Sequence, residues 1–353
     1  MRKDRQRVHA ARAFMSRRRL LAVGAALTWS GTAAARAEAI PGGGRTAVDA
    51  VPTKRADWRR VATVLGREGN VARGMIYHTD FPRRDLHVVS YGVTVSSGLA
   101  LGSHVAFVRY ADGTTMMMGD LVVTEDELQV VTGTLQRHGI EQSALHKHLL
   151  SHSPDVWWTH VHAHGRDAVS MADGVREALD RTGTPPARPR DPTKVDLDTE
   201  GIDAAMGTKG SHYDGVYKCT FARRETIVDG GYVLPPGLGS TSAFSFQALG
   251  SGRAAVNGDF VVVGQEVQKV LKALRRGGIK IVELHNHGLR EEPRLFFIHF
   301  WGVDDAVRLA KVLRSALDVT NVTSYGGEAH ERPTVSGASS APGRQLPPSA
   351  HRA

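Results

Sequence analysis

The chain has 353 residues, of which 41 % are hydrophobic and 23 % are charged, as is ordinary for a globular protein with a substantial core. Its formal charge of +9 would suit a polyanionic partner, but residues 1–37 contain nine Lys or Arg and one acid, which supplies +8 of that charge. The remainder is nearly neutral, so the composition predicts no nucleic-acid partner. The one cysteine, Cys219, excludes an internal disulfide, and we expect it to be buried.

Residues 1–37 have the three parts of a signal peptide. A basic stretch ends in Ser-Arg-Arg-Arg-Leu-Leu at 16–21, a short apolar run follows, and Ala-Arg-Ala at 35–37 offers a cleavage site. The paired arginines are typical of twin-arginine export. The alternative, a membrane anchor, needs roughly 20 apolar residues, and this run is shorter. We therefore expect an exported protein, extracellular or in the periplasm or cell envelope, with no stable membrane insertion after cleavage.

Residues 38–56 contain a Pro-Gly-Gly-Gly run and predict a flexible lead-in. A first structural unit is expected over 57–181. It opens with a helix capped by Asp57 and closed by Gly66, and its later helices begin near Thr124 and Asp167. Between the first two helices lie four β-type runs, at 74–81, 86–95, 104–110 and 114–123.

Residues 182–197 are rich in proline and predict a linker, after which 198–320 repeats the order of elements. The predicted fold class is α+β, with two tandem copies of an α-β4-α-β-β-α unit packed as a pseudo-twofold pair. Residues 326–353 turn to Gly, Ser, Pro and Ala, which predicts a disordered tail.

The two units share a histidine pattern at a constant offset of 139 residues. Leu-His-Lys-His at 145–148 and Trp-Trp-Thr-His at 157–160 correspond to Leu-His-Asn-His at 284–287 and Phe-Phe-Ile-His at 296–299. An ungapped alignment of 119–160 with 258–299 gives 17 identities in 42 positions. The repeated histidines are His146, His148, His160, His285, His287 and His299. His138 and His152 have no counterpart, so abundance alone does not explain the pattern.

Side chains two apart in a strand share a face, so the histidines of each unit can converge. Three neutral imidazoles can bind a divalent metal ion such as zinc and leave a position open for water, which the metal would activate as a nucleophile. The alternative is a structural role as buried hydrogen-bonding groups. Asp120, Asp259 and Glu283 could assist, and we name Glu283 and Asp259 as candidate bases. The second site looks better furnished, because Ala144 replaces Glu283 and Lys147 replaces Asn286 in the first unit.

Paired arginines followed by an acid also recur, at 83–85 and 223–225. They could grip a carboxylate or phosphate, or form an internal ion pair. The aromatic pairs at 157–158 and 296–297 suit a core better than a sugar platform.

Several motifs together resemble the LppY/LpqO family, named for bacterial lipoproteins. They are Asp-Trp at 57–58, Phe-Pro-Arg-Arg-Asp-Leu at 81–86, Met-Gly-Asp at 118–120, both Leu-His-x-His runs, and the stretch from Pro293 to Trp301. The resemblance implies no established activity or catalytic residues. Because no cysteine stands at the leader's exit, it implies a soluble exported member.

Three hypotheses follow. The protein is an exported metal-dependent enzyme of a hydrolytic kind, a metal- or ligand-binding envelope protein without turnover, or a structural protein whose histidines are only buried hydrogen-bonding groups. Its partner would be a small molecule or an envelope ligand.

Overall fold

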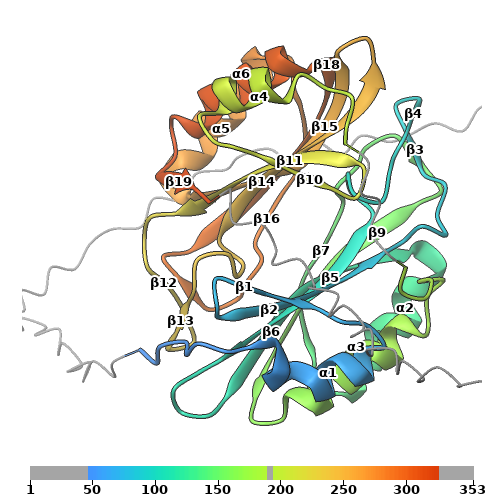
Figure 1. The fold of residues 1–353 in the computed structure, drawn as a ribbon, viewed down its shortest axis with the longest axis vertical. Helices are drawn as coiled ribbons and strands as arrows, with labels where there is room; N and C mark the ends of the chain where they lie inside the picture. Colours follow the sequence, from blue (N-terminus) through green and yellow to red (C-terminus); the bar gives the residue numbers. More distant parts are fainter. Residues whose placement is uncertain (1–46, 189–193, 326–353) are drawn as a thin grey trace, which may run out of the picture. The chain divides into compact units, whose positions relative to one another are not determined.

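The computed structural model describes residues 47–188 and 194–325. The predicted signal peptide, residues 38–46 of the lead-in, the middle of the linker and the tail lie outside these residues. The described chain forms two similar halves of helices and antiparallel sheets (Figure 1). The helices of the first half are η1 (Arg55–Trp58), α1 (Arg59–Leu65), α2 (Glu125–Arg137) and α3 (Ala168–Leu179). Those of the second half are α4 (Thr199–Met206), α5 (Gly264–Arg276) and α6 (Ala306–Leu317).

Each half is built on one main antiparallel sheet. The first has the order β1 (Asn70–Ala72), β2 (Ile76–Pro82), β5 (Gly102–Arg109), β6 (Thr115–Thr124), β9 (Val156–Gly165) and β7 (Glu141–His146). The second has the order β10 (Ser211–Tyr213), β11 (Val216–Arg223), β14 (Thr241–Gly250), β15 (Arg253–Val263), β18 (Leu295–Asp305) and β16 (Lys280–His285), and β19 (Val322–Ser324) also pairs with β11. Strand for strand, the two orders correspond.

The second β-type run of each half leaves the main sheet, in contrast to the single strand predicted there. Residues 86–95 give the hairpin β3 (Val89–Ser90) and β4 (Val93–Thr94), and 225–234 give β12 (Ile227–Asp229) and β13 (Tyr232–Leu234). Both hairpins turn over two residues with positive φ, Tyr91 with Gly92 and Gly230 with Gly231, which is the geometry that a two-residue turn requires. They pair with β8 (His152–Ser153) and β17 (Glu291–Glu292).

Helices cover one face of each sheet (Figure 1). Two of the predicted caps account for helix starts: Thr124 and Glu127 form a capping box on α2, and Asp167 accepts backbone bonds at α3. The predicted cap Asp57 was wrong, because it lies inside η1 and accepts from the backbone N of Lys54, and α1 starts after Trp58. Asp305, which was not predicted, caps α6. The other sheet faces contribute to two apolar clusters that mix the halves. Trp158 and Trp301 share one of these clusters, and Met116 and Phe297 share the other. The halves therefore pack through apolar surface on either side of the site described below.

The repeated arginines form internal ion pairs. Arg83 is 1 % exposed, and its guanidinium donates to Asp85, Glu127 and the Val122 carbonyl oxygen. Arg223 repeats this arrangement with Glu225 and Glu266. These contacts fix the start of α2 or α5 to the end of β2 or β11, so neither guanidinium is available to grip a ligand.

Residues 47–53 lie against the sheets, in contrast to the flexible lead-in predicted there. Val48 exchanges backbone hydrogen bonds with Gly231 and Val233, and Val51 bonds to Arg109. Cys219 is buried, as expected. Within 47–188 and 194–325, no helix is long and apolar enough to cross a membrane.

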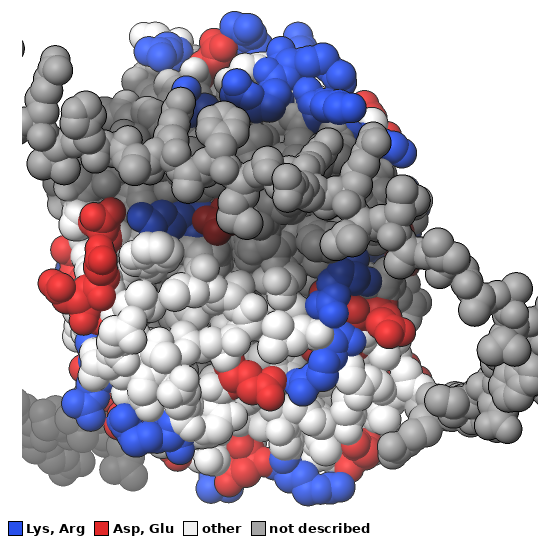
Figure 2. Space-filling view, turned by 180° about the vertical axis from the view of Figure 1, so that it is seen from behind, with Lys and Arg blue, Asp and Glu red and all other residues white. Residues whose placement is uncertain are grey.

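On one face of the molecule, Lys and Arg gather at the end where α5 and α6 lie, and both signs of charge occur elsewhere on that face (Figure 2). The exposed cations of α5 are Lys269, Lys272, Arg275 and Arg276.

Candidate metal centre

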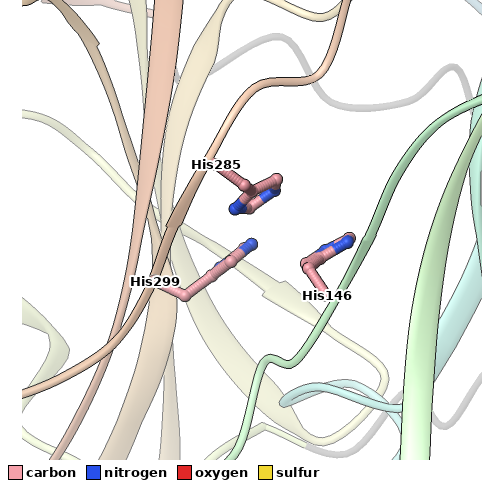
Figure 3. Close-up of side chains that lie close together, drawn as sticks. All are labelled: His146, His285 and His299. Carbon is pink, nitrogen blue, oxygen red and sulfur yellow. The ribbon is translucent and has the colours of Figure 1, made fainter.

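The six repeated histidines meet in one cluster between the two main sheets. Across the halves, ring centroids lie 4.0 Å apart for His146 and His285, 4.0 Å for His148 and His299, and 3.7 Å for His160 and His287. Figure 3 shows three of these rings, with His146 coming from one half and His285 and His299 from the other. The sequence predicted convergence within each half, and the structure adds convergence between them.

Strand geometry places each ring. β7 and β16 end at His146 and His285, while His160 and His299 lie within β9 and β18. His148 and His287 follow the ends of their strands, and each stacks on a buried aromatic ring: His148 on Trp158 at 4.6 Å between centroids, and His287 on Phe297. The second member of each aromatic pair is thus a core residue that orients a histidine.

The glycines before Asp120 and Asp259 hold the third histidines. Gly119 and Gly258 lie where a Cβ would collide with a carbonyl oxygen of the neighbouring strand, so only glycine allows the strands to approach. The carbonyl oxygens of these glycines face Nδ1 of His160 at 3.4 Å and Nδ1 of His299 at 3.1 Å. Because a carbonyl only accepts, Nδ1 must carry the proton, and the lone pair of Nε2 is left facing the cluster. A histidine that binds a metal through Nε2 has this arrangement.

Burial keeps the imidazoles neutral. It lowers the pKa of His148 to about 3 and of His160 to about 4, and together with repulsion from the neighbouring histidines it lowers the pKa values of His146, His285, His287 and His299 well below the ordinary value. Neutral imidazole is the form that binds metal ions.

Several polar atoms in this cluster are buried without a hydrogen-bond partner among the described residues. They are Nδ1 of His146 and His285, Nε2 of His287 and His299, and Oδ1 of Asp120. A buried polar atom without a partner costs free energy and is rare in folded proteins. Five buried nitrogen and oxygen atoms of one cluster, each able to bind a metal ion through a lone pair, thus lack a hydrogen-bond partner. A cation as their common partner fits this observation.

Sets of side chains that hold ligand atoms within 4.8 Å of one another include His146 with His285 and His299, His160 with His285 and His287, and Asp120 with His146 and His160. Both all-histidine sets combine residues of the two halves, whereas the sequence grouped the histidines half by half. Buried histidine and aspartate side chains are thus positioned to bind a metal ion.

Asp120 joins the first half's histidines more closely than was expected. Its Oδ2 lies 3.3 Å from Nε2 of His148 and 3.9 Å from Nε2 of His146, and these two nitrogens are 2.9 Å apart. Lys147 points away, with Nζ over the Trp157 ring and 3.6 Å from Asp155. The first half therefore brings a carboxylate to its histidines, in contrast to the expectation that the second would be better furnished.

The two candidate bases lie in different places. Glu283 accepts a hydrogen bond at 3.0 Å from the backbone N of Lys147, between His146 and His148, so it fixes the other half's histidine loop. In the opposite direction, the Ser143 hydroxyl of the first half donates a hydrogen bond to the carbonyl oxygen of His287 in the second half. Asp259 accepts from the backbone N of Ala243 at 3.3 Å, and burial raises its pKa to about 7. Of the two candidate bases, Glu283 is therefore the one that holds the loop of the other half.

A cavity of about 1170 Å³ opens beside the cluster. Its wall includes Asp120, Asp259 and four of the six repeated histidines, His148, His160, His287 and His299. The volume suits a small molecule or a short oligomer of small units.

Sequence reasoning missed two cavity residues of the first half, His104 and Asp80. The strand register aligns Asp80 with His104, His104 with Asp120, and Asp120 with His160. They lie outside the repeated motif, because Thr220 and Ala243 stand in register with Asp259 on the second sheet. The only signal in the sequence was a histidine at a single inward-facing position of a predicted strand.

The sequence profile of the family described as Domain of Unknown Function (DUF1259) matches the chain twice, over residues 59–181 and 200–319. The chain therefore belongs to that family and contains two copies of its domain. No curated protein matches it.

Two solved structures show slight similarity. One is a double-ringed trimeric shell protein of the RMM microcompartment (11 % identity, TM-score 0.17, 58 % of this chain and 82 % of that one). The other is the trimeric bacterial microcompartment shell protein PduB (14 % identity, TM-score 0.16, 69 % of this chain and 86 % of that one). Scores this low support no argument about fold or function.

Proposed function

We propose that this protein is a metal-dependent enzyme of the hydrolytic type, with zinc or a similar divalent ion held by the histidine cluster at the wall of the cavity. The observation that carries the proposal is the set of buried lone-pair donors without partners. A purely structural role would leave those atoms buried without a hydrogen-bond partner, whereas a histidine that serves only the core has partners for both ring nitrogens.

The chain's own residues supply what a hydrolytic site needs. A bound divalent ion would supply Lewis-acid chemistry at the cavity wall. Asp259 lines the same cavity and has a pKa of about 7, so near neutral pH it can accept a proton and return it. The Gly119 and Gly258 carbonyls hold the tautomers of His160 and His299, and Glu283 holds the loop that carries His148.

The second candidate is metal or ligand binding without turnover. It is favoured by the density of imidazoles, because four nitrogens around one ion would close its coordination and leave no position for a substrate. Two measurements separate the candidates: the number of exchangeable waters on the bound metal, and activity.

Export completes the proposal and rests on residues 1–37 alone, as does the twin-arginine route. The protein would then meet its small-molecule or envelope ligand outside the cytoplasm. The motif resemblance to the LppY/LpqO family supports the same placement.

The experiment uses protein without a polyhistidine tag, purified after mild dialysis and measured by elemental analysis. We expect at least one divalent transition metal per chain, and none in the variant His146→Ala/His285→Ala. A matched control is His87→Ala, which changes an exposed histidine outside the cluster. Metal-loaded protein is then tested on chromogenic carboxyl-ester, phosphate-ester and amide substrates. Metal-free wild-type protein that takes up no zinc would overturn the proposal, and binding without turnover would leave the second candidate.

A further inference from the structure

The ring-to-ring distances in the cluster come in matched pairs. The separation of His148 from His299 (4.0 Å) matches that of His287 from His160 (3.7 Å), and the separation of His146 from His299 (5.2 Å) matches that of His285 from His160 (5.4 Å). Repeat-equivalent residues exchange places in each comparison. The six rings thus follow a local twofold symmetry whose axis passes between His146 and His285.

Under this symmetry, the third histidine of each half lies beside the His-x-His pair of the other half. Nε2 of His160 is 3.3 Å from Nε2 of His285, and both belong with His287 to one compact set. The symmetry-equivalent set is His299 with His146 and His148, of which His146 and His299 also form a compact set with His285. Nitrogens that share a tetrahedral zinc ion at roughly 2.0–2.1 Å lie about 3.4 Å from each other. The separations of 3.3 Å and, for His146 and His148, 2.9 Å are close to that value.

We propose that the cluster binds two metal ions per chain, each held by the His-x-His pair of one half and the third histidine of the other. The first position consists of His146, His148 and His299, and the second of His160, His285 and His287. This inference rests on the proposed metal binding and deepens it. It also gives the duplication a chemical reason, because a single half supplies neither complete ligand set.

The two positions differ in their carboxylates. Asp120 lies within 3.3 Å of His148 and 3.9 Å of His146 at the first position. Its repeat equivalent, Asp259, is instead engaged with the Ala243 backbone and lies in the field of Lys218. The first position therefore has a mixed imidazole and carboxylate set, and the second has imidazoles alone. Softer or more nitrogen-preferring ions should fill the second position first.

The test counts zinc ions per chain on the full protein without a tag, after removal of metal and titration with zinc to saturation. His148→Phe and His287→Phe keep an aromatic ring against Trp158 and Phe297 while removing the nitrogens, so each should empty one position without opening a cavity. We expect two zinc ions in the wild type, one in each single variant, and none bound tightly in the double variant. Thermal melts and near-ultraviolet circular dichroism of the metal-free variants confirm folding.

Cobalt substitution reads the two positions separately. The cobalt absorption spectrum of His148→Phe should report the all-imidazole position, and that of His287→Phe the position with Asp120. Asp120→Asn should alter only the spectrum of the His287→Phe protein, and this arm holds even if His148→Phe fails to fold. One zinc per wild-type chain, lost entirely in each single variant, would mean a single shared ion and overturn the inference. No zinc in the wild type would instead contradict the proposed function itself.

Discussion

Replacing Asp120 by asparagine should have two effects: it should weaken metal binding, and it should stabilise the metal-free protein. The carboxylate is 4 % exposed on its side chain, and Oδ1 has no hydrogen-bond donor among the described residues. In the metal-free protein its charge is therefore poorly compensated, and burial raises its pKa. An uncharged isostere removes that penalty. With metal bound, the same charge faces the cation, and its loss removes a favourable interaction.

The size of the effect follows from the position of the carboxylate. Loss of even an outer partner of a metal ligand typically costs about 10–100-fold in metal affinity, which is about 1.4–2.7 kcal/mol. Since Oδ2 is 3.3 Å from Nε2 of His148, close enough to share an ion with it, we expect the upper part of that range. Zinc affinity is measured by competition with a chromogenic chelator, and stability by urea melts of metal-free protein.

Asp259→Asn is the matched control, because it changes the repeat-equivalent acid. It also removes a buried charge, so metal-free stability should rise at pH 8, above its pKa of about 7. Its zinc affinity should stay within about threefold of the wild type, because its carboxylate is engaged by the Ala243 backbone and forms no ion pair with a histidine among the described residues. Equal losses of affinity in the two variants, or an unchanged affinity in Asp120→Asn, would refute the assignment of Asp120 to the centre.

Three further predictions concern acid, the buried arginine and export. Metal-free protein should lose stability as the pH falls below about 6.5, because histidines of the unfolded chain take up protons there while folded His148 and His160, with pKa values of about 3 and about 4, do not. Each fully buried histidine should lower the free energy of unfolding by roughly 1.4 kcal/mol between pH 7.5 and pH 5.5. Equal urea midpoints at these two pH values would contradict this. Arg83→Met should cost about 3–5 kcal/mol in urea melts, because it leaves two carboxylates without their buried cation. Arg84→Met should cost less than about 1 kcal/mol, because the Arg84 side chain is 28 % exposed and its partner Asp214 keeps the hydrogen bond from Ser97; similar losses would show that burial of the arginine is not the cause. Changing Arg17 and Arg18 together to lysine should trap the precursor in the cytoplasm by fractionation and immunoblot, and unchanged processing would indicate the general secretory route.

The histidine motif could be predicted from the sequence because its information is local. A His-x-His pair at a strand end, a third histidine on the next strand and a glycine beside Asp120 are each set by alternation within a strand or by a close approach of neighbouring strands. Thr124, Asp167 and Gly66 likewise marked helix ends through short-range capping.

The exchange of ligands between the halves was not predictable in the same way. Whether His160 serves its own half or faces His287 depends on how two sheets pack, and no residue spacing within one half encodes that packing. Glu283 was unpredictable for the same reason. Two residues before His285 in the sequence, it was named as a candidate base, yet its carboxylate accepts a hydrogen bond from the Lys147 backbone of the other half. The single-strand predictions at 86–95 and 225–234 failed for a local reason, because each run contains a two-residue turn with positive φ, Tyr91-Gly92 or Gly230-Gly231, that was taken as part of one strand.

Duplication made two equal halves, and the cavity shows that they are no longer equal. Across the first sheet, Asp80, His104, Asp120 and His160 stand in one row by register, whereas the second sheet offers Thr220, Ala243, Asp259 and His299. Lys218 contributes positive charge from the second sheet and acts on both His104 and Asp259. A molecule in the cavity therefore meets a titratable wall on one side and a cation beside a single acid on the other. The local twofold symmetry of the six histidine rings alone would allow a bound molecule two equivalent orientations. The unequal walls, and Asp120 at the first metal position only, favour one of them, so the asymmetry of the halves selects how the ligand is oriented.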